Sequence, residues 1–146
     1  MRILVATDAW HPQVNGVVRT YEHLAQELER LGIELSIVAP NEFYTLPCPT
    51  YPEIRLALPG WRRLARRFEI LKPDAIHVAT EGSIGWMARH YCRSRSSPFT
   101  TCFHTRFPEY LEHRFAIPPR WTTAALRRFH NAGRGLMVAT PSLARE

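Results

Sequence analysis

The stretch ILVATDAWHPQVNG at residues 3–16 reads as a strand, a loop and the start of a helix. Residues 3–6 form a compact apolar run, which is typical of a buried strand. Asn15-Gly16 ends the loop, residues 16–31 place apolar side chains three or four positions apart, and Gly32 follows as a helix stop. This unit predicts a parallel α/β sheet, whose ligands bind where loops meet helix N-termini.

The alternation of strand and helix patterns continues along the chain. Strands are predicted over residues 35–39, 54–58, 75–79, 99–103 and 136–139, and helices over 61–71 and 83–94. Two short helices are expected between the last two strands, the second starting near Pro118, and a final helix opens at Pro141-Ser142. The proline-rich residues 40–52 predict an extended surface loop. The fold class is therefore α/β, a Rossmann-like parallel sheet with helices on both faces.

Composition limits the possible classes of protein. A chain of 146 residues is the size of one domain, and 45% hydrophobic residues is ordinary for a soluble protein. The formal charge of +6 favours anionic partners such as phosphates, nucleic acid or acidic lipid surfaces. The three cysteines match neither a zinc pattern nor a disulfide framework, and the N-terminus lacks a signal-peptide core. These features predict a cytoplasmic protein.

The first turn carries a single glycine, Gly16. Without a Cβ, Gly16 would let a phosphate approach free backbone N–H groups at a helix N-terminus, where the helix dipole attracts negative charge. The alternative is that Asn15-Gly16 is only a turn and a helix cap. A nicotinamide dehydrogenase is disfavoured, because the dinucleotide fingerprint is absent and the second strand ends in Ala39-Pro40 rather than an acidic residue.

Several segments, taken in order, resemble family-4 glycosyltransferases of the GT-B fold. They are DAWHPQVNGV with LAQEL (residues 8–17 and 24–28), KPDAIHVATEG (72–82), PFTTCFHT (98–105) and LMVATPS (136–142). Typical members carry two glycines where this chain has Asn15-Gly16. The asparagine variant resembles the branch of mannosyl- and sulfoquinovosyl-type lipid glycosyltransferases.

The resemblance implies that residues 1–146 are the N-terminal, acceptor-side half of a GT-B fold. The chain ends just after a helix begins, so we expect it to be truncated before a C-terminal nucleotide-sugar-binding domain. The implied reaction is retaining transfer of a hexose, with mannose expected, from GDP-mannose or a UDP-sugar to a lipid or glycan hydroxyl. No metal or other cofactor is expected, and the isolated chain is expected to be inactive.

The resemblance also implies roles for particular residues. His104 matches the catalytic-region histidine that contacts the transferred sugar, and Asn15 and Gly16 match the donor phosphate and sugar site. Asp8, Glu81 and Arg106 are candidates for the acceptor side. For each of these three an alternative stays open: Asp8 holds the loop together, Glu81 caps a helix, and Arg106 is a solvated surface residue. His77, inside a strand, is predicted to be a hydrogen-bonded core histidine.

The predicted helix 61–71 combines an apolar stripe with basic side chains. The cluster of Arg62, Arg63, Arg66 and Arg67 suits an anionic membrane surface. The alternative is that the stripe packs on the sheet and the arginines are solvated; both can hold together. We therefore expect a cytoplasmic protein that is peripheral on the membrane.

A second function class stays open, a small basic α/β module that binds phosphate-bearing ligands or nucleic acid without catalysis. No nucleic-acid-binding motif occurs, so nucleic acid is not an expected partner. The oligomeric state is left open.

Overall fold

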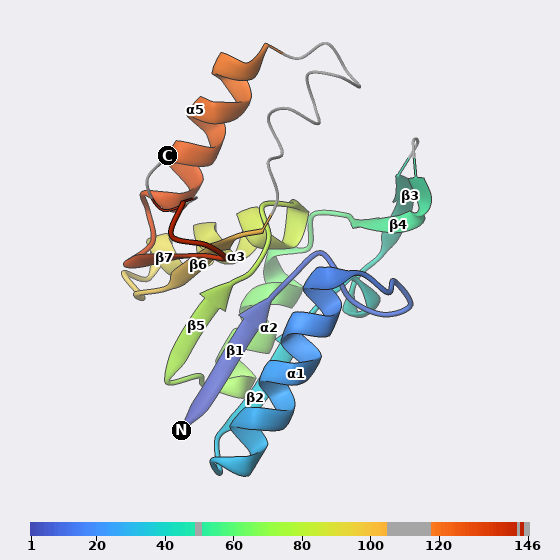
Figure 1. Ribbon diagram of the computed structural model, residues 1–146. Helices are drawn as coiled ribbons and strands as arrows, with labels where there is room; N and C mark the ends of the chain where they lie inside the picture. Colours follow the sequence, from blue (N-terminus) through green and yellow to red (C-terminus); the bar gives the residue numbers. More distant parts are fainter. Residues whose placement is uncertain (49–50, 105–117, 143, 145–146) are drawn as a thin grey trace.

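The computed structural model describes residues 1–48, 51–104, 118–142 and 144 (Figure 1). Its main sheet is parallel and has the strand order β2-β1-β5-β6-β7. The strands are β1 (Arg2–Ala6), β2 (Glu34–Val38), β5 (Ala75–Val78), β6 (Thr100–Phe103) and β7 (Gly135–Val138). The helices are α1 (Gly16–Arg30), α2 (Trp61–Leu71), α3 (Ser83–Ser94) and α5 (Pro119–His130). The predicted α/β class with a parallel sheet is confirmed.

Helices cover both faces of the sheet (Figure 1). On one face, α2, α3 and α5 bury Phe68, Met87 and Phe129 against the strands in the larger apolar core. On the other face, Tyr21 of α1 packs in a smaller cluster with Val5 and Ala79. The reversal of strand order at β1 places α1 opposite the other helices, because each crossover is right-handed.

The first helix is less buried than its periodicity predicts. Gly32 follows the helix with φ of 69°, the left-handed conformation expected of a glycine stop. Of the predicted apolar face, Tyr21 is buried, whereas Leu24 is 37% and Leu31 is 72% exposed. Among the described helices, α1 alone belongs to the smaller cluster, so its outer turns have no neighbouring helix to pack against.

Residues 40–58 differ from the prediction. Residues 40–52 are not one extended loop: a 3₁₀ turn at Pro40–Glu42 leads into β3 (Thr45–Cys48) and β4 (Tyr51–Ala57), an antiparallel pair outside the main sheet. Prolines lack the N–H that a central strand needs, but a two-stranded pair consists only of edges and tolerates them. The alternation of apolar and polar residues over 54–58 belongs to this hairpin and not to a buried parallel strand.

A buried arginine joins α3 to the end of α5. Arg89 Nε donates to the carbonyl oxygen of Phe129 at 3.2 Å, and its terminal nitrogen donates to that of Arg128 at 2.7 Å. These carbonyls lie in the last turn of α5, where no later helical N–H is available to them. Arg89 therefore fixes the C-terminal part of α5 next to the sheet, although α5 follows α3 by more than twenty residues.

No helix in the described ranges is long and apolar enough to cross a bilayer. The predicted final helix lies mostly outside the described residues, and so does the first of the two short helices expected before β7.

Candidate functional site

A cavity of about 630 Å³ lies at the carboxyl ends of β1, β5 and β6. Its lining combines the loops after these strands with the first turns of α1 and one side chain of β4. The side chains and backbone that line it include those of Asp8, Gln13, Asn15, Gly16, Thr20, Leu56, Thr80, Glu81 and His104. Gly16 and His104 thus border the same cavity, as the sequence pattern predicts for loops at one sheet edge.

The N-terminus of α1 opens on this cavity. Asn15 is its N-cap, and its Oδ1 accepts a hydrogen bond from the N–H of Val18 at 3.0 Å. Among the described residues, no group accepts from the N–H of Gly16 or Val17. Gly16 and Val17 both line the cavity, and a Cβ built on Gly16 meets nothing within 4 Å. The helix entrance is therefore able to receive an anion. The helix-cap interpretation of Asn15 is confirmed as geometry, and its role toward a donor stays a prediction.

The N-terminus of α3 reaches the same cavity but is already occupied by Asp8. The carboxylate accepts from the backbone N–H of Ile84 at 2.8 Å and of Gly85 at 3.2 Å, and from the hydroxyls of Thr80 and Ser83. The pKa of the Asp8 carboxyl is raised above its usual value, because the effect of burial exceeds that of these four hydrogen bonds, which lower it. These contacts tie Asp8 to Thr80 and to the first turn of α3, which matches the interpretation that Asp8 holds the loop together.

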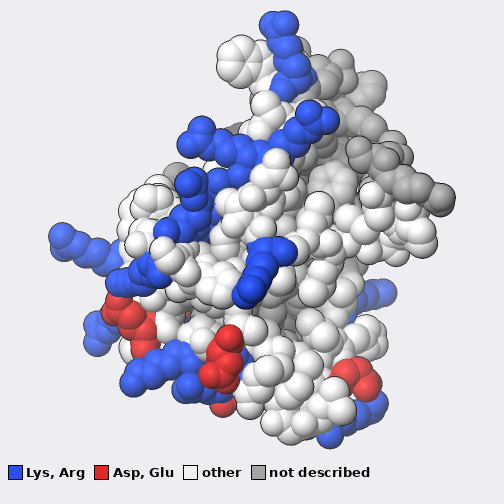
Figure 2. All heavy atoms as spheres, turned by 90° about the vertical axis from the view of Figure 1, so that its left-hand side faces the viewer, with Lys and Arg blue, Asp and Glu red and all other residues white. Residues whose placement is uncertain are grey.

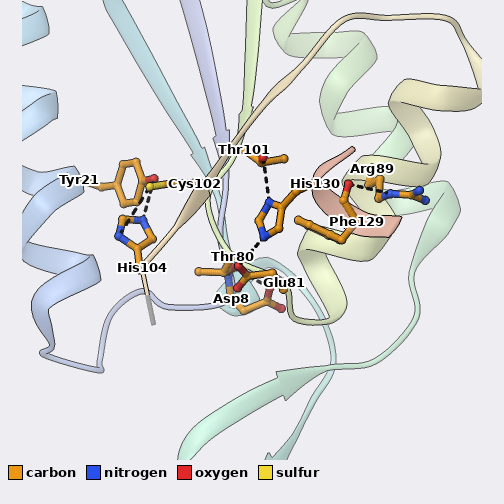
Figure 3. Close-up of polar contacts among 10 residues, drawn as sticks. All are labelled: Asp8, Tyr21, Thr80, Glu81, Arg89, Thr101, Cys102, His104, Phe129 and His130. Atoms are coloured by element: carbon orange, nitrogen blue, oxygen red, sulfur yellow. Dashed lines mark hydrogen bonds and ion pairs between the residues drawn. The ribbon is translucent and has the colours of Figure 1, made fainter. Parts of the chain in front are cut away.

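Glu81 is fixed by a histidine from α5 (Figure 3). Its Oε1 lies 3.1 Å from Nε2 of His130, and Nδ1 of His130 lies 2.9 Å from Oγ1 of Thr101. Both side chains of the pair are largely buried. Glu81 does not cap α3, because Asp8 does; that alternative for Glu81 is wrong. Its predicted role on the acceptor side remains a prediction, and Glu81 does line the cavity.

His104 follows the last residue of β6 and is held by two long contacts (Figure 3). Its Nε2 lies 3.3 Å from the hydroxyl of Tyr21, and its Nδ1 lies 3.8 Å from the thiol sulfur of Cys102. Burial lowers the pKa of the His104 imidazole, and the negative charge of Glu81 opposes this shift. A half-buried, neutral imidazole that can donate on one side and accept on the other is suited to bind a hydroxyl.

His77 is a hydrogen-bonded core histidine, as predicted. It is 8% exposed, and its Nε2 lies 2.8 Å from the hydroxyl of Tyr21 while its Nδ1 lies 2.8 Å from Oγ1 of Thr100. Burial, and to a lesser extent a positive charge on His104, lower the pKa of His77 to about 4. His77 is therefore neutral at physiological pH.

The basic cluster of α2 lies away from this cavity. Leu64 and Phe68 are buried, which confirms that the apolar stripe packs on the sheet, whereas Trp61 is 48% exposed. The side chains of Arg62, Arg63 and Arg66 are exposed. Arg67 is paired with Glu42 and is not a free surface cation. Arg106 lies outside the described residues.

Two site residues, Tyr21 and His130, were not expected from the sequence. Tyr21 looks like one more member of the apolar face of α1, and only the fold places its hydroxyl between His77 and His104. His130 lies 49 positions after Glu81, at the end of a helix, with no motif around it. Within the described ranges, no three or more metal-ligating side chains come together.

Comparison with known proteins matches this chain to one protein family and to individual enzymes. Residues 14–146 match the model of the family described as Glycosyltransferase Family 4. Alpha-monoglucosyldiacylglycerol synthase of Acholeplasma laidlawii is 26% identical over 88% of this chain and 36% of its own length. GDP-mannose-dependent alpha-mannosyltransferase of Mycobacterium tuberculosis (strain CDC 1551 / Oshkosh) is 24% identical over 98% of this chain and 43% of its own length. The chain thus spans about two fifths of the length of these relatives.

Proposed function

Because the chain belongs to glycosyltransferase family 4, we propose that it forms the acceptor-side half of an enzyme that transfers a hexose from a nucleotide sugar to a lipid or glycan hydroxyl. The observation that carries the proposal is the shared cavity. It is lined both by the first residues of α1, whose N–H groups have no acceptor among the described residues, and by the imidazole of His104. The relatives reported are glycosyltransferases by name and give no support to a non-catalytic binding module.

In this proposal five of the residues that line the cavity have a chemical task. The N–H groups of Gly16 and Val17 receive the donor diphosphate, with Asn15 holding the helix entrance open. His104 forms a hydrogen bond with the transferred sugar. Glu81, held by His130, accepts a hydrogen bond from the acceptor hydroxyl. Retention at the anomeric carbon then follows from attack on the same face that the leaving diphosphate departs from, and catalysis is positioning and charge stabilisation. No metal is required in this scheme.

The names of the relatives suggest the substrates to test. We propose GDP-mannose or a UDP-sugar as donor, and a membrane lipid as the first acceptor to examine. The relatives are longer than this chain, so we propose that the remainder of the donor site comes from a second domain like the part of the relatives that this chain does not match, and that the 146-residue chain alone gives no transfer. Turnover by this chain alone would contradict the need for a second half.

The transfer assay uses the protein expressed at the full length of its reading frame, with radiolabelled GDP-mannose or UDP-glucose and diacylglycerol or phosphatidylinositol vesicles. His104→Ala is predicted to lower turnover by about a hundredfold, the effect typical of one lost donor at a reacting centre. His23→Ala is the matched control, because His23 is an exposed histidine of α1 away from the cavity. Undiminished turnover in His104→Ala would overturn the proposed site.

We also propose that the protein is peripheral on the cytoplasmic face of a membrane, with α2 as the contact. Arg62 and Arg63 flank a separate cavity of about 610 Å³ whose apolar lining includes Tyr44, Leu58 and Trp61. All three of these apolar side chains are exposed. Aromatic and apolar groups next to arginines suit the boundary between lipid headgroups and acyl chains.

A second basic region provides the control for this surface. Figure 2 shows Lys and Arg side chains gathered on the face that carries α5, where Arg120, Arg127 and Arg128 are exposed. When Arg62, Arg63 and Arg66 are changed to Gln, the affinity for vesicles rich in acidic lipid, measured by sedimentation, should fall about a hundredfold, because each arginine contributes about 1 kcal/mol. The same change of the three α5 arginines should have little effect. Equal losses in both variants would indicate non-specific attraction by net charge.

A further inference from the structure

The hydroxyl of Tyr21 lies between two imidazoles. Its oxygen is 2.8 Å from Nε2 of His77 and 3.3 Å from Nε2 of His104. Tyr21 is 3% exposed, and burial raises the pKa of its phenol above the usual value, so the hydroxyl keeps its proton. A phenol has one proton to donate. The thiol of Cys102 also neighbours this hydroxyl, but sulfur is a weak acceptor, so the phenol donates to one of the two rings and the other ring donates to the phenol oxygen.

The two contacts differ in length, and the difference indicates their direction. A phenol is more acidic than the N–H of a neutral imidazole, so its O–H is the stronger donor and forms the shorter of the two hydrogen bonds. The contact with His77 is the shorter one, at 2.8 Å, so the O–H is assigned to it, and the 3.3 Å contact with His104 is left for an N–H donated by that ring. The short contact is thus the one in which Tyr21 donates.

His77 completes the chain of hydrogen bonds. Its ring is neutral, so a ring that accepts at Nε2 must carry its proton on Nδ1. Nδ1 lies 2.8 Å from Oγ1 of Thr100, a hydroxyl oxygen that is able to accept this hydrogen bond. His77 and His104 then carry their protons on opposite ring nitrogens, although both face the same hydroxyl.

We propose that Tyr21 and His77 are positioning residues that hold His104 as its Nε2–H tautomer, leaving Nδ1 as the acceptor that His104 offers to a sugar hydroxyl. The assignment of the hydroxyl to a sugar rests on the proposed function. In the free protein, Nδ1 has only the thiol of Cys102 at 3.8 Å, a weak donor. A ligand hydroxyl is a stronger donor and replaces that contact at little cost.

The test is ¹⁵N NMR of the histidine side chains in the 146-residue chain at neutral pH, with no substrate present. His104 is expected as the Nε2–H tautomer and His77 as the Nδ1–H tautomer. In His77→Leu the Tyr21 hydroxyl loses its acceptor and turns to donate to His104, so His104 should change to the Nδ1–H tautomer. His77→Gln keeps a carbonyl acceptor for Tyr21 and should leave the Nε2–H form. A structural role alone would not distinguish these two variants.

A His104 that carries its proton on Nδ1 in the unchanged chain, or one that keeps the same tautomer in His77→Leu, would overturn the proposal. If His77→Leu does not fold, Tyr21→Phe decides, with Tyr91→Phe as the matched control on α3. Tyr21→Phe should make the Nε2 proton of His104 exchange with water at least about tenfold faster, and Tyr91→Phe should not; equal exchange in the two would contradict the proposal. The tautomers are measured without turnover, so they separate this inference from the transfer assay.

Discussion

Two helix N-termini meet at the same cavity, and they differ in what occupies them. The entrance of α1 is capped by its own neighbour Asn15, which uses one N–H and leaves those of Gly16 and Val17 without an acceptor among the described residues. The entrance of α3 is filled by the carboxylate of Asp8, which comes from the end of β1. Both helix dipoles attract negative charge, but a carboxylate already lies at the entrance of α3, whereas no acidic side chain lies within the first turn of α1.

The comparison shows that one helix N-terminus stabilises the fold while the other remains accessible to a ligand. A distant carboxylate at α3 ties β1 to the loop after β5 and so fixes Thr80 and Glu81 in the lining. A local cap at α1 stabilises the helix without closing its entrance. The glycines follow the same division: a Cβ on Gly85 would lie 1.8 Å from the carbonyl oxygen of Thr80, whereas one on Gly16 meets nothing within 4 Å.

The largest expected loss of stability follows a substitution at the N-terminus of α3. Gly85→Ala must displace either the helix or the backbone at Thr80, since the added Cβ would overlap a carbonyl oxygen. We expect a loss of about 4 kcal/mol in the free energy of unfolding, the range of severe overpacking. Urea denaturation of the 146-residue chain measures it, with Gly16→Ala as the control. A Gly85→Ala protein as stable as the control would show that the close packing of α3 on Thr80 is not as described.

The next effect is a pH dependence at the α1 end, where Tyr21 contacts the buried His77. The pKa of His77 falls from 6.5 to about 4 on folding. Between these values the unfolded chain binds a proton that the folded protein does not, so stability is full above pH 6.5 and decreases as pH falls toward 4. The total loss is about 3 kcal/mol. Denaturation at several pH values should show this slope, and His77→Gln should flatten it; an unchanged slope in His77→Gln would assign it to other groups.

A smaller loss should follow Asp8→Asn, which has almost the same shape. The amide has only one acceptor oxygen. Its NH₂ group would stand where Oδ2 of Asp8 now accepts from the Thr80 hydroxyl and the Gly85 N–H, so these two donors would lose their acceptor. We expect a loss of about 2 kcal/mol, the contribution of hydrogen bonds to a charged group. Thermal unfolding measures it, with Asp74→Asn at the half-exposed pair with Arg2 as the control. If both variants lose the same stability, the cap at α3 contributes no more than a surface ion pair.

The smallest expected effect on stability follows a substitution at the N-terminus of α1. Gly16→Ala should keep or slightly raise stability, because alanine favours a helix over glycine by up to about 1 kcal/mol. The added methyl group stands beside the open N–H groups, so affinity for inorganic pyrophosphate should fall about tenfold. Calorimetric titration of both proteins tests this. Unchanged affinity would mean that pyrophosphate does not approach this helix entrance.

The sequence predicts the repeating part of this fold well. The periodic helices over 61–71 and 83–94 begin and end where expected, and the strand ends converge on one edge of a parallel sheet. That convergence is enough to place Gly16 and His104 at one cavity. The prolines of residues 40–52, in contrast, suggest a loop, because their compatibility with a hairpin of two edge strands depends on where the chain folds back.

Contacts between distant segments are the part that no local pattern encodes. Glu81 meets His130 only because α5 returns to the sheet, and Arg89 helps to hold it there. Asp8 finds Ile84 and Gly85 because β1 and β5 are neighbours in the sheet although far apart in the chain. The sequence supplies these residue types, and the tertiary packing decides their partners.

The most direct test is an NMR titration of the ¹⁵N-labelled chain with GDP-mannose, UDP-glucose and inorganic pyrophosphate. If the entrance of α1 receives the diphosphate, the backbone amides of Gly16 and Val17 shift with all three ligands, while those of Ile84 and Gly85, already bound to Asp8, stay in place. Shifts confined to Ile84 and Gly85, or no response at Gly16 at millimolar ligand, would contradict the account.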